Sequence, residues 1–456
     1  CLFFFDRLAT TELYTLSLHD ALPIVEALVN WRRRSLLIFM LGLLFGLAVA
    51  RIFCWQGVIV PIRIASGSMV PTLPGAHFAV ICEDCEFSFQ CDATSVPASG
   101  EAVCPNCGFP GNALTNHQLR LGQRVVIDRF PYLLRTPRRW DLVVFYDPRV
   151  PDTKTVKRVV GLPGETVVIR RGDLFVDGKI LRRSIDVQRS MAVLVHDDTF
   201  RPARSNNLPP RWDSLQEPSG WEASSTGYHF SPTAEPGQVD WLSFRNWRCF
   251  VSPFVRSQET PVRDHYGYNQ NTSRGKLHNV TDLMLSCRVR WSGASKLWLS
   301  VRNGRDSFQV ELDRRHSTAT IRRQDIVIGK RDCPLLTDFC QLEFGICDRQ
   351  LFLTVNRRVA FRLPFDPSEQ PLEPTASPLA LGGDGAELEI GELQVFRDIY
   401  YLDPNGWGQE CRLQVQSEGG EILVLGDNVP ISRDSRHWES AGLAHKSLIG
   451  RVLTPF

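Results

Sequence analysis

Two serines in a short polar stretch have the residue types and the spacing of a nucleophilic site. Ser66 and Ser68 flank Gly67 in residues 65–72, which read ASGSMVPT, and Pro71 stiffens the end of the stretch. A serine that attacks a carbonyl needs little bulk beside it, and glycine permits unusual backbone angles there. Because Ser-Gly-Ser occurs in many loops, the stretch predicts chemistry only together with residues further along the chain.

A lysine downstream is the candidate proton acceptor. Lys157 lies among β-branched residues in segment 155–160, TVKRVV, which reads as a strand ending at the turn GLPG. A lysine in such a strand usually points to solvent. If it points into the core instead, burial lowers its pKa, and the neutral amine can take a proton from a serine hydroxyl. The sequence leaves both orientations open.

A third polar block lies near the end of the chain. The strand-like run 420–425 leads into Gly426, Asp427 and Asn428, and Ser432, Asp434 and Arg436 follow. Read by itself, this block is a polar loop with an Asp–Arg ion pair.

The three blocks, in this order, resemble the type I signal peptidases, the membrane-bound Ser-Lys proteases that remove signal peptides. The resemblance covers residues 58–81, 115–185 and 410–456. It implies a serine endopeptidase, signal peptidase I, whose partners are the signal peptides of exported preproteins, bound as an extended strand. Small side chains are implied one and three residues before the cut, and no cofactor is implied for catalysis.

The resemblance also implies a role for each residue of the first two blocks. Ser68 corresponds to the nucleophile and Lys157 to the general base. The hydroxyl of Ser66 and the backbone N–H of Ser68 correspond to the oxyanion hole, which stabilises the negative charge of the tetrahedral intermediate.

In the third block the implied roles are supporting ones. Ser432 corresponds to the serine that hydrogen-bonds and orients the lysine, and Asp434 and Arg436 correspond to the pair that buttresses the site. Asp427 and Asn428 shape the loop. The chain departs from the family at residues 429–431, VPI, where many members carry polar or basic residues.

Two cysteine pairs interrupt the resemblance. Cys82 and Cys85 form one C-x-x-C pair, Cys104 and Cys107 the other, and residues 86–103 separate them. Two such turns direct four thiolates at one ion, so the spacing favours a zinc ribbon over residues 80–112 with one structural Zn²⁺. Two disulfides are the alternative. Cys91 is left over and is expected only to pack.

An apolar segment at residues 32–56 predicts a single transmembrane anchor, with the lipid bilayer as a partner. Three arginines precede it, and its apolar part is long enough for a hydrocarbon core of ~30 Å. The arginines predict a cytoplasmic N-terminus and an extracytoplasmic catalytic domain at the cell membrane. A cleaved signal peptide is the rival interpretation. Residues 1–31 are expected to be a non-native or disordered extension, since residues up to 24 resemble translated sequencing adapter.

Residues 190–398 form a second interruption with short alternating strands, which predict a β-sandwich. Their order resembles the laminin-G or concanavalin-like jelly roll, many of whose members bind carbohydrate. An alternative function follows: a membrane-tethered surface protein whose sandwich binds carbohydrate or protein, with the protease fold as a platform. The retained serines, lysine, aspartate and arginine favour the enzyme, because a platform needs none of them.

The elements that must position these residues are strands. We expect a mainly β chain with one N-terminal transmembrane helix, in which a signal-peptidase β-barrel core is built from residues 57–189 and 399–456 around the two insertions. The net charge of +2 predicts no basic surface for a nucleic-acid partner.

Overall fold

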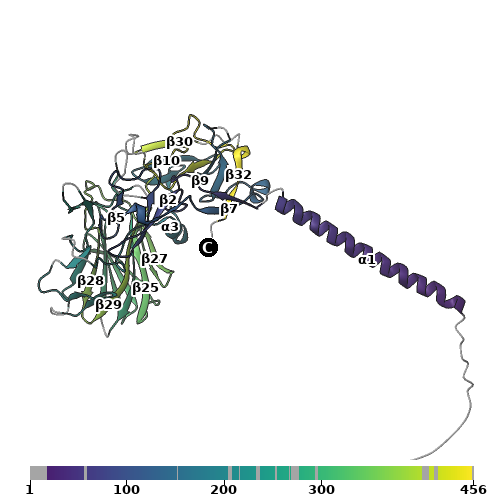
Figure 1. Cartoon of the computed structure of the whole chain (residues 1–456). Coiled ribbons are helices and arrows are strands. Elements are labelled where there is room, and N and C mark those ends of the chain that lie inside the picture. Colours follow the sequence, from purple (N-terminus) through teal and green to yellow (C-terminus); the bar gives the residue numbers. More distant parts are fainter. Residues whose placement is uncertain are drawn as a thin grey trace, which may run out of the picture. The chain divides into compact units, whose positions relative to one another are not determined.

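The computed structural model describes residues 18–55, 59–150, 152–203, 208–214, 216–232, 237–251, 254–265, 268, 277–292, 296–402, 410–414 and 420–453. The chain divides into two compact units, Cys1–Val60 and Pro61–Phe456. Figure 1 traces both units from the N-terminus in purple to the C-terminus in yellow. Each unit is described by itself below.

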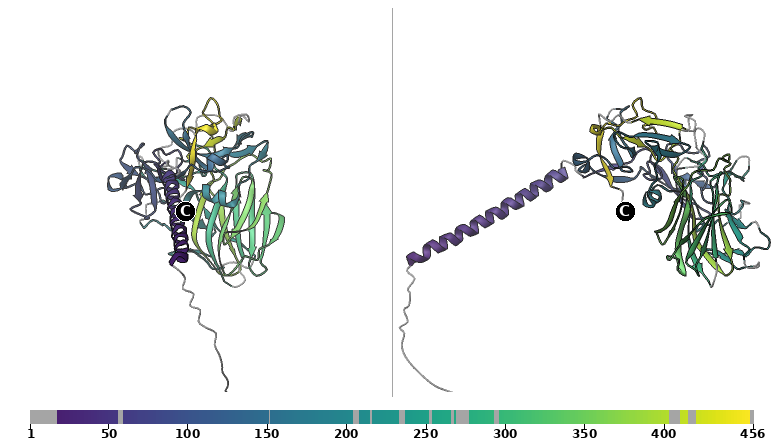
Figure 2. Two further views of the ribbon diagram at one scale, coloured as in Figure 1. Left: turned by 90° about the vertical axis from the view of Figure 1, so that its right-hand side faces the viewer. Right: turned by 180° about the vertical axis from the view of Figure 1, so that it is seen from behind.

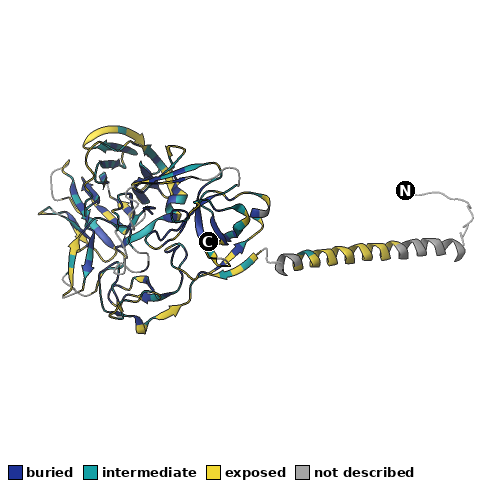
Figure 3. Cartoon of the chain, turned by 90° about the horizontal axis from the view of Figure 1, so that it is seen from above, coloured by how far each residue is buried: buried dark blue, intermediate teal, exposed yellow. Residues whose placement is uncertain are grey.

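The first unit contains one long helix, α1 (Leu18–Trp55). Its segment Arg33–Arg51 has a mean hydropathy of 1.8 over 19 residues and is apolar and long enough to cross a membrane. The side chains of this segment are exposed, as the yellow helix in Figure 3 shows. The helix begins well before residue 32, the predicted start of the anchor, because residues 24–31 contain no glycine or proline that would end it. Residues 1–17 of the predicted extension lie outside the described residues.

The second unit is mainly β, as predicted, and one of its sheets carries the residues of the candidate site. Six strands form it in the order β1 (Ile59–Arg63), β7 (Arg124–Asp128), β32 (Leu448–Leu453), β8 (Leu142–Tyr146), β9 (Lys154–Gly161) and β31 (Leu423–Leu425). A smaller sheet has the order β12 (Lys179–Ile180), β11 (Asp173–Val176), β10 (Thr166–Arg170) and β30 (Glu410–Gln414). Strands from both ends of the core sequence therefore pair, although the sandwich separates them in the chain.

The cysteine-containing insertion forms two small sheets. One has the order β3 (Ser88–Asp92), β2 (His77–Ile81) and β6 (Gln118–Arg120), and the other pairs β4 (Glu101–Ala102) with β5 (Asn112–Ala113). The short helices of the unit are η1 (Leu114–Asn116), α2 (Pro131–Leu134), α3 (Ile185–Met191) and η2 (His445–Ser447). Ser184 begins α3, since its hydroxyl accepts the backbone N–H of Val187.

The predicted β-sandwich is present and supplies the largest core. One sheet has the order β15 (Trp221–Ala223), β16 (Gly227–Phe230), β29 (Leu388–Arg397), β20 (Leu283–Trp291), β25 (Phe339–Cys347), β26 (Gln350–Val355) and β27 (Arg358–Pro364), with β13 (Val193–Asp197) also paired to β29. The other has the order β14 (Trp212–Ser214), β17 (Asp240–Phe244), β28 (Leu379–Asp384), β21 (Lys296–Arg302), β22 (Ser307–Asp313), β23 (Thr318–Arg323) and β24 (Ile326–Asp332). Between β17 and β20 in the sequence, β18 (Trp247–Phe250) and β19 (Arg256–Glu259) pair as a separate hairpin.

Alternation of apolar and polar residues explains the two layers, which the two views of Figure 2 show in green and teal. In β22 the side chains of Phe308, Val310 and Leu312 are fully buried, while the residues between them are partly exposed. Apolar side chains of both sheets join one hydrophobic cluster between the layers.

Two features join the sandwich to the core. The chain enters it at Val193 and leaves it at Arg397, and these two residues are paired across β13 and β29. The buried Arg183 forms ion pairs with Asp348 and Asp398, at 2.6 and 2.5 Å. Because all three side chains are nearly excluded from solvent, these contacts fix the segment before α3 against the sandwich.

Candidate active site

The structure brings Ser68 and Lys157 together at the edge of the core sheet. A hydrogen bond of 2.5 Å joins Lys157 Nζ and Ser68 Oγ, although the residues are 89 positions apart. Lys157 projects from β9, which pairs with β8 on one side and β31 on the other. Ser68 lies in the turn after β1, where the backbone N–H of Leu73 donates to the carbonyl of Met69.

Lys157 points inward, which settles the two orientations that the sequence left open. Its side chain is only 2 % exposed, because six consecutive residues of β9 are buried. Burial, opposed by the attraction of Asp434 and assisted by the charge of Arg436, lowers the pKa of Lys157 from 10.5 to about 8. The amine is therefore half neutral near pH 8 and mostly neutral above it.

Two donors lie next to Ser68. Ser66 Oγ is 3.3 Å from Ser68 Oγ, and Ser66 itself is exposed. The backbone N–H of Ser68 donates to no acceptor among the described residues. Both groups thus lie beside Ser68 Oγ, and their role as an oxyanion hole stays a prediction.

The loop after β31 places a buried ion pair close to Ser68 and Lys157. Arg436 Nε and Nη2 donate to the two carboxylate oxygens of Asp434, each at 2.8 Å, and both side chains are fully buried. Burial alone would raise the pKa of Asp434, but the charge of Arg436 holds it well below its usual range. The backbone N–H of Gly426 also donates to Asp434, at 2.9 Å.

Ser432 takes a different partner from the expected one. Its hydroxyl donates to Asp434 Oδ2 at 2.7 Å. Among the described residues Ser432 makes no hydrogen bond to Lys157, so it acts on the lysine through Asp434. The loop approaches closely here, because a Cβ on Gly426 would lie 2.1 Å from Ser432 Oγ and 2.7 Å from the carbonyl oxygen of Ser68.

A second ion pair ties the two loops together, and the sequence analysis missed most of it. Arg158, which follows the lysine, donates from Nε and Nη2 to Asp427 at 2.9 and 2.6 Å. The hydroxyl of Thr72 donates to the same carboxylate at 2.5 Å. The available signal was the position of Arg158 next to Lys157 in a buried strand, where a cation requires a partner.

Asn428 and Tyr268 hold the backbone of the serine segment. Asn428 Nδ2 donates to the carbonyl of Gly67 at 2.9 Å, and its backbone N–H donates to the carbonyl of Ser68 at 3.0 Å. The ring of Tyr268, from the sandwich insertion, packs so closely that a Cβ on Gly67 would lie 2.4 Å from it. Nothing in the sequence linked Tyr268 to this segment.

The four predicted zinc ligands also come together, at a separate place. The thiols of Cys82, Cys85, Cys104 and Cys107 are buried, unbridged, and have sulfurs all within 4.8 Å of one another. The separations Cys82–Cys107 and Cys85–Cys104 are 3.6 and 3.7 Å. Sulfurs around a tetrahedral zinc with Zn–S bonds of ~2.3 Å lie about 3.8 Å apart, so the donor set fits zinc.

Both cysteine turns have the same backbone geometry. The N–H groups of Glu86 and Gly108 each donate at 3.0 Å to the carbonyl of the first cysteine in their pair. Both residues have a positive φ, of 62° and 79°. The repeated turn is consistent with two halves of one metal site, at which all four positions would be occupied by protein.

Residues 109–212 match the model of the family described as signal peptidase, peptidase S26. This segment contains Lys157 but neither Ser68 nor the third block. The match supports a peptidase and, with the apolar helix, a membrane-anchored protein.

Curated relatives are similar over a comparable length. A probable signal peptidase I-2 of Synechocystis is 35 % identical over 68 residues, which is 14 % of this chain and 31 % of the relative. Signal peptidase I V of Bacillus subtilis is 37 % identical over 65 residues, 14 % of this chain and 37 % of the relative. The chain spans about a third of the length of these relatives.

Among solved structures, a carbohydrate-binding module of Bacillus subtilis aligns with 41 % of this chain and 94 % of its own length, at a TM-score of 0.26 and 9 % identity. A protein of unknown function with a galectin-like fold, also from Bacillus subtilis, aligns with 44 % of this chain and 95 % of its own, at a TM-score of 0.30 and 9 % identity. Likenesses at this level assign no ligand to the sandwich.

Proposed function

We propose that this chain is a membrane-bound serine endopeptidase that cleaves signal peptides from exported preproteins with a Ser68–Lys157 dyad. The observation that carries the proposal is the 2.5 Å hydrogen bond between Ser68 Oγ and a lysine amine that is buried and has a lowered pKa. The similarity to signal peptidases over residues 109–212 supports the substrate class.

The chemistry follows from the positions of the donors. Neutral Lys157 accepts the proton of Ser68 as its Oγ attacks the scissile carbonyl, and the backbone N–H of Ser68 and the hydroxyl of Ser66 stabilise the oxyanion, each by up to ~3 kcal/mol. The lysine ammonium then donates its proton to the leaving amine. In the second half, Lys157 takes a proton from a water molecule as the water oxygen attacks the acyl carbonyl. The bond between the acyl carbon and Ser68 Oγ then breaks, and the lysine ammonium returns its proton to Ser68 Oγ.

The supporting residues keep the lysine usable. Asp434 lies near enough to attract a charged Lys157, which would raise its pKa, but Arg436 pairs with Asp434 and offsets that attraction. Arg158 and Asp427 join the strand of the base to the loop that holds the carbonyl of Ser68 through Asn428.

The test is cleavage of a model preprotein by the full chain in detergent. Ser68→Ala and Lys157→Ala are each expected to lower the rate by at least roughly a thousandfold, since the chemistry then rests on the oxyanion donors alone. Ser99→Ala and Lys154→Ala, which alter exposed residues, are matched controls that should retain the parent rate. Near-normal cleavage by either dyad variant, with an intact circular dichroism spectrum, would refute the proposal.

We also propose one structural Zn²⁺ at Cys82, Cys85, Cys104 and Cys107. The fit of the sulfur separations supports zinc over disulfides. The arginines before the apolar helix support a cytoplasmic N-terminus and an extracytoplasmic active site.

A second function for the sandwich is supported by two tryptophans. Trp241 and Trp298 lie on the outer face of their sheet, since their strand neighbours Leu242 and Leu297 are in the core, and their ring centroids are 6.5 Å apart. Arg322 lies 5.3 Å from the ring of Trp298. Aromatic rings beside charged donors suit a sugar, so we infer a carbohydrate ligand here. The test is binding to a polysaccharide resin that retains the parent chain. Equal retention of the Trp298→Ala variant would contradict a sugar site at these tryptophans.

A further inference from the structure

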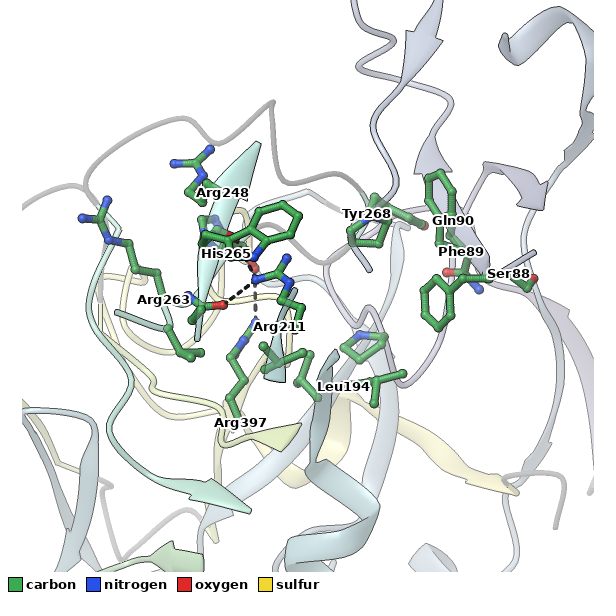
Figure 4. Close-up of a pocket in the computed structure, with 18 residues that line it drawn as sticks. Ser88, Phe89, Gln90, Leu194, Arg211, Arg248, Arg263, His265, Tyr268 and Arg397 are labelled. Carbon is green, nitrogen blue, oxygen red and sulfur yellow. Dashed lines mark hydrogen bonds between the residues drawn. The ribbon is translucent and has the colours of Figure 1, made fainter. Parts of the chain in front are cut away.

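A cavity of about 240 Å³ lies where the cysteine-containing insertion, the sandwich and the serine segment meet. Phe89 and Gln90 of β3 form one wall, Arg211 and Trp247 of the sandwich form another, and Pro71 lies at its margin. By the same measure one water needs only roughly 10–15 Å³, so the cavity has room for a small organic molecule. Figure 4 shows the side chains that line it.

The lining is strongly cationic. Arg211, Arg248, Arg263 and Arg397 contribute to it together with His265, and no aspartate or glutamate is among its described lining residues. In Figure 4, Arg211 and Arg397 point toward each other in the middle of the view, and Arg248 and Arg263 lie on its outer side. Four guanidinium groups that share one cavity repel one another unless an anion lies between them.

Arg211 is the most buried of the four, with 8 % of its side chain exposed. Its Nη1 donates to Asn246 Oδ1 at 3.2 Å and to the carbonyl of Trp247 at 2.9 Å, while its buried Nε has no partner. The guanidinium lies 3.7 Å from the centre of the Trp247 ring. No carboxylate of the described residues pairs with it, which is costly for a buried cation.

The thiols of Cys104 and Cys107 attract Arg211 from the other side. A zinc–thiolate centre would therefore offset part of its charge. No cysteine acts on Arg397 or His265 in this way, so a bound metal would leave the positive charge of Arg397 in the cavity.

Arg397 and Arg263 also lack a carboxylate partner within the described part of the chain. Arg397 donates to two backbone carbonyls, of Asp398 at 3.0 Å and His265 at 3.2 Å. The guanidinium of Arg263 makes no hydrogen bond to any described residue, and its Nε is buried. Asp264 and Asp398 attract Arg397, but neither lines the cavity.

His265 reports the positive potential of this cavity. Burial, together with the charges of Arg248, Arg397 and Arg263, lowers its pKa to about 3. Its buried Nδ1 has no partner either. Atoms of Arg211, Arg263 and His265 that have no partner among the described residues thus converge on one space, and no aspartate or glutamate is among its described lining residues.

We propose that this cavity binds a phosphate monoester, with the phosphate held by Arg211, Arg263 and Arg397. The planar fork of arginine matches two phosphate oxygens at once, and a phosphate dianion supplies the negative charge that the lining lacks. Phe89, Leu194 and Tyr268 form an apolar wall for the organic part of the ligand. The proposal does not depend on the proteolytic function.

Occupation of the cavity would reach the serine segment through Tyr268. Tyr268 lines the cavity and also packs against Gly67 and Val70, on either side of the nucleophile. A bound ligand therefore restricts the ring that fixes the backbone at Ser68.

The test is calorimetric titration of the purified full chain in zwitterionic detergent with inorganic phosphate and with glycerol 3-phosphate, at constant ionic strength. Saturable binding is expected, and Arg263→Gln and Arg397→Gln should each weaken it at least about tenfold, because each removes a charge-assisted contact. Arg290→Gln is the control, since Arg290 is exposed and paired with Glu389. Arg263→Gln should fold, because it breaks no hydrogen bond. Absence of saturable binding, or parent-like binding by both cavity variants, would overturn the proposal.

A second titration separates the two sources of such a group. Tighter binding of glycerol 3-phosphate than of micelles doped with phosphatidic acid supports a soluble phosphate monoester, and the reverse order supports a lipid headgroup. Whichever of the two ligands binds, loss of its binding in Arg263→Gln assigns the binding site to this cavity.

Discussion

Lys157 is an amine held in its reactive form by its surroundings. Burial is the largest cause of the lowered pKa of Lys157, and Arg436 offsets part of the attraction that Asp434 exerts on a charged lysine. The aspartate is retained because it accepts hydrogen bonds from Gly426, Ser432 and Arg436, which together fix the loop. The arginine therefore has two effects, since it pairs with Asp434 and helps to lower the pKa of Lys157.

The pH dependence of cleavage follows from this arrangement. Only the neutral amine accepts a proton, so the rate should rise with pH and reach half its plateau near pH 8, the value to which burial lowers the pKa of Lys157. Arg436→Met should move the midpoint to higher pH, because Asp434 then stabilises the charged lysine unopposed. Arg433→Met, an exposed change in the same loop, should leave it in place. A parent midpoint at 10.5, the ordinary value, would contradict a buried base.

The same shift affects stability. Between pH ~8 and ~10.5 the unfolded chain holds a proton on Lys157 that the folded chain has lost, so folded stability should rise with pH across this window.

Gly426→Ala tests the close approach of the two loops. The new Cβ would lie 2.1 Å from Ser432 Oγ and 2.7 Å from the carbonyl oxygen of Ser68. One of them must move, and a displacement of about 1 Å at a nucleophile costs roughly a hundredfold in kcat/KM. Gly391→Ala is the matched control, because its Cβ would meet nothing nearer than 3.4 Å. Equal kcat/KM for the two variants would show that the approach has no catalytic importance.

At the residue level, the sequence predicted residues that belong to motifs and missed contacts that form only between distant segments of the chain. Ser68, Lys157, Asp434 and Arg436 lie in recognisable blocks, and the structure brings them together. Thr72 lies in the first block, but its contact with Asp427 joins distant segments, as does the contact of Tyr268 with Gly67, so no local pattern predicts either contact.

Strand β9 shows why the elements of the site were easier to predict than their surroundings. Its β-branched residues and the following turn mark it as a strand. It pairs with β8 and β31, and consecutive residues on both of its faces are buried. The predicted sandwich strands with strict alternation, such as β22, also appear where expected. By contrast β24 has exposed apolar residues, Ile326 and Val327, and α3 has only seven residues, so neither produced a periodic signal.

The core of the cysteine-containing insertion is small, and five of its nine buried residues are cysteines, so its stability should depend on metal. Elemental analysis of the purified chain is expected to give one zinc per chain, and Cys104→Ser should lose it and unfold at a lower temperature. Cys287→Ala, in the sandwich core, should keep its zinc. A metal-free parent chain with two bridged cysteine pairs by mass spectrometry would favour disulfides.

Within the second unit, Arg183 connects the core and the sandwich through two buried ion pairs. Arg183→Met leaves the buried carboxylates of Asp348 and Asp398 without a cation, which should lower the free energy of unfolding by about 3–5 kcal/mol. In calorimetry the core and the sandwich of the parent chain should unfold in one transition, whereas those of the variant should unfold in two. Arg290→Met, which removes an exposed pair, should change stability by less than about 1 kcal/mol. A variant as stable as this control would show that the network contributes little.

The pairing of Val193 with Arg397 has a consequence for how such a chain can be assembled in evolution. Because the two residues are neighbours across a strand pair, the chain leaves and rejoins the peptidase core at a single point in space, about 5 Å wide. A gene segment encoding the whole sandwich can therefore be inserted as one cassette without stretching the parent chain. Arg183 and Tyr268 now make contacts between the sandwich and the core. Removal of the sandwich would break these contacts, so the insertion is harder to lose than it was to gain.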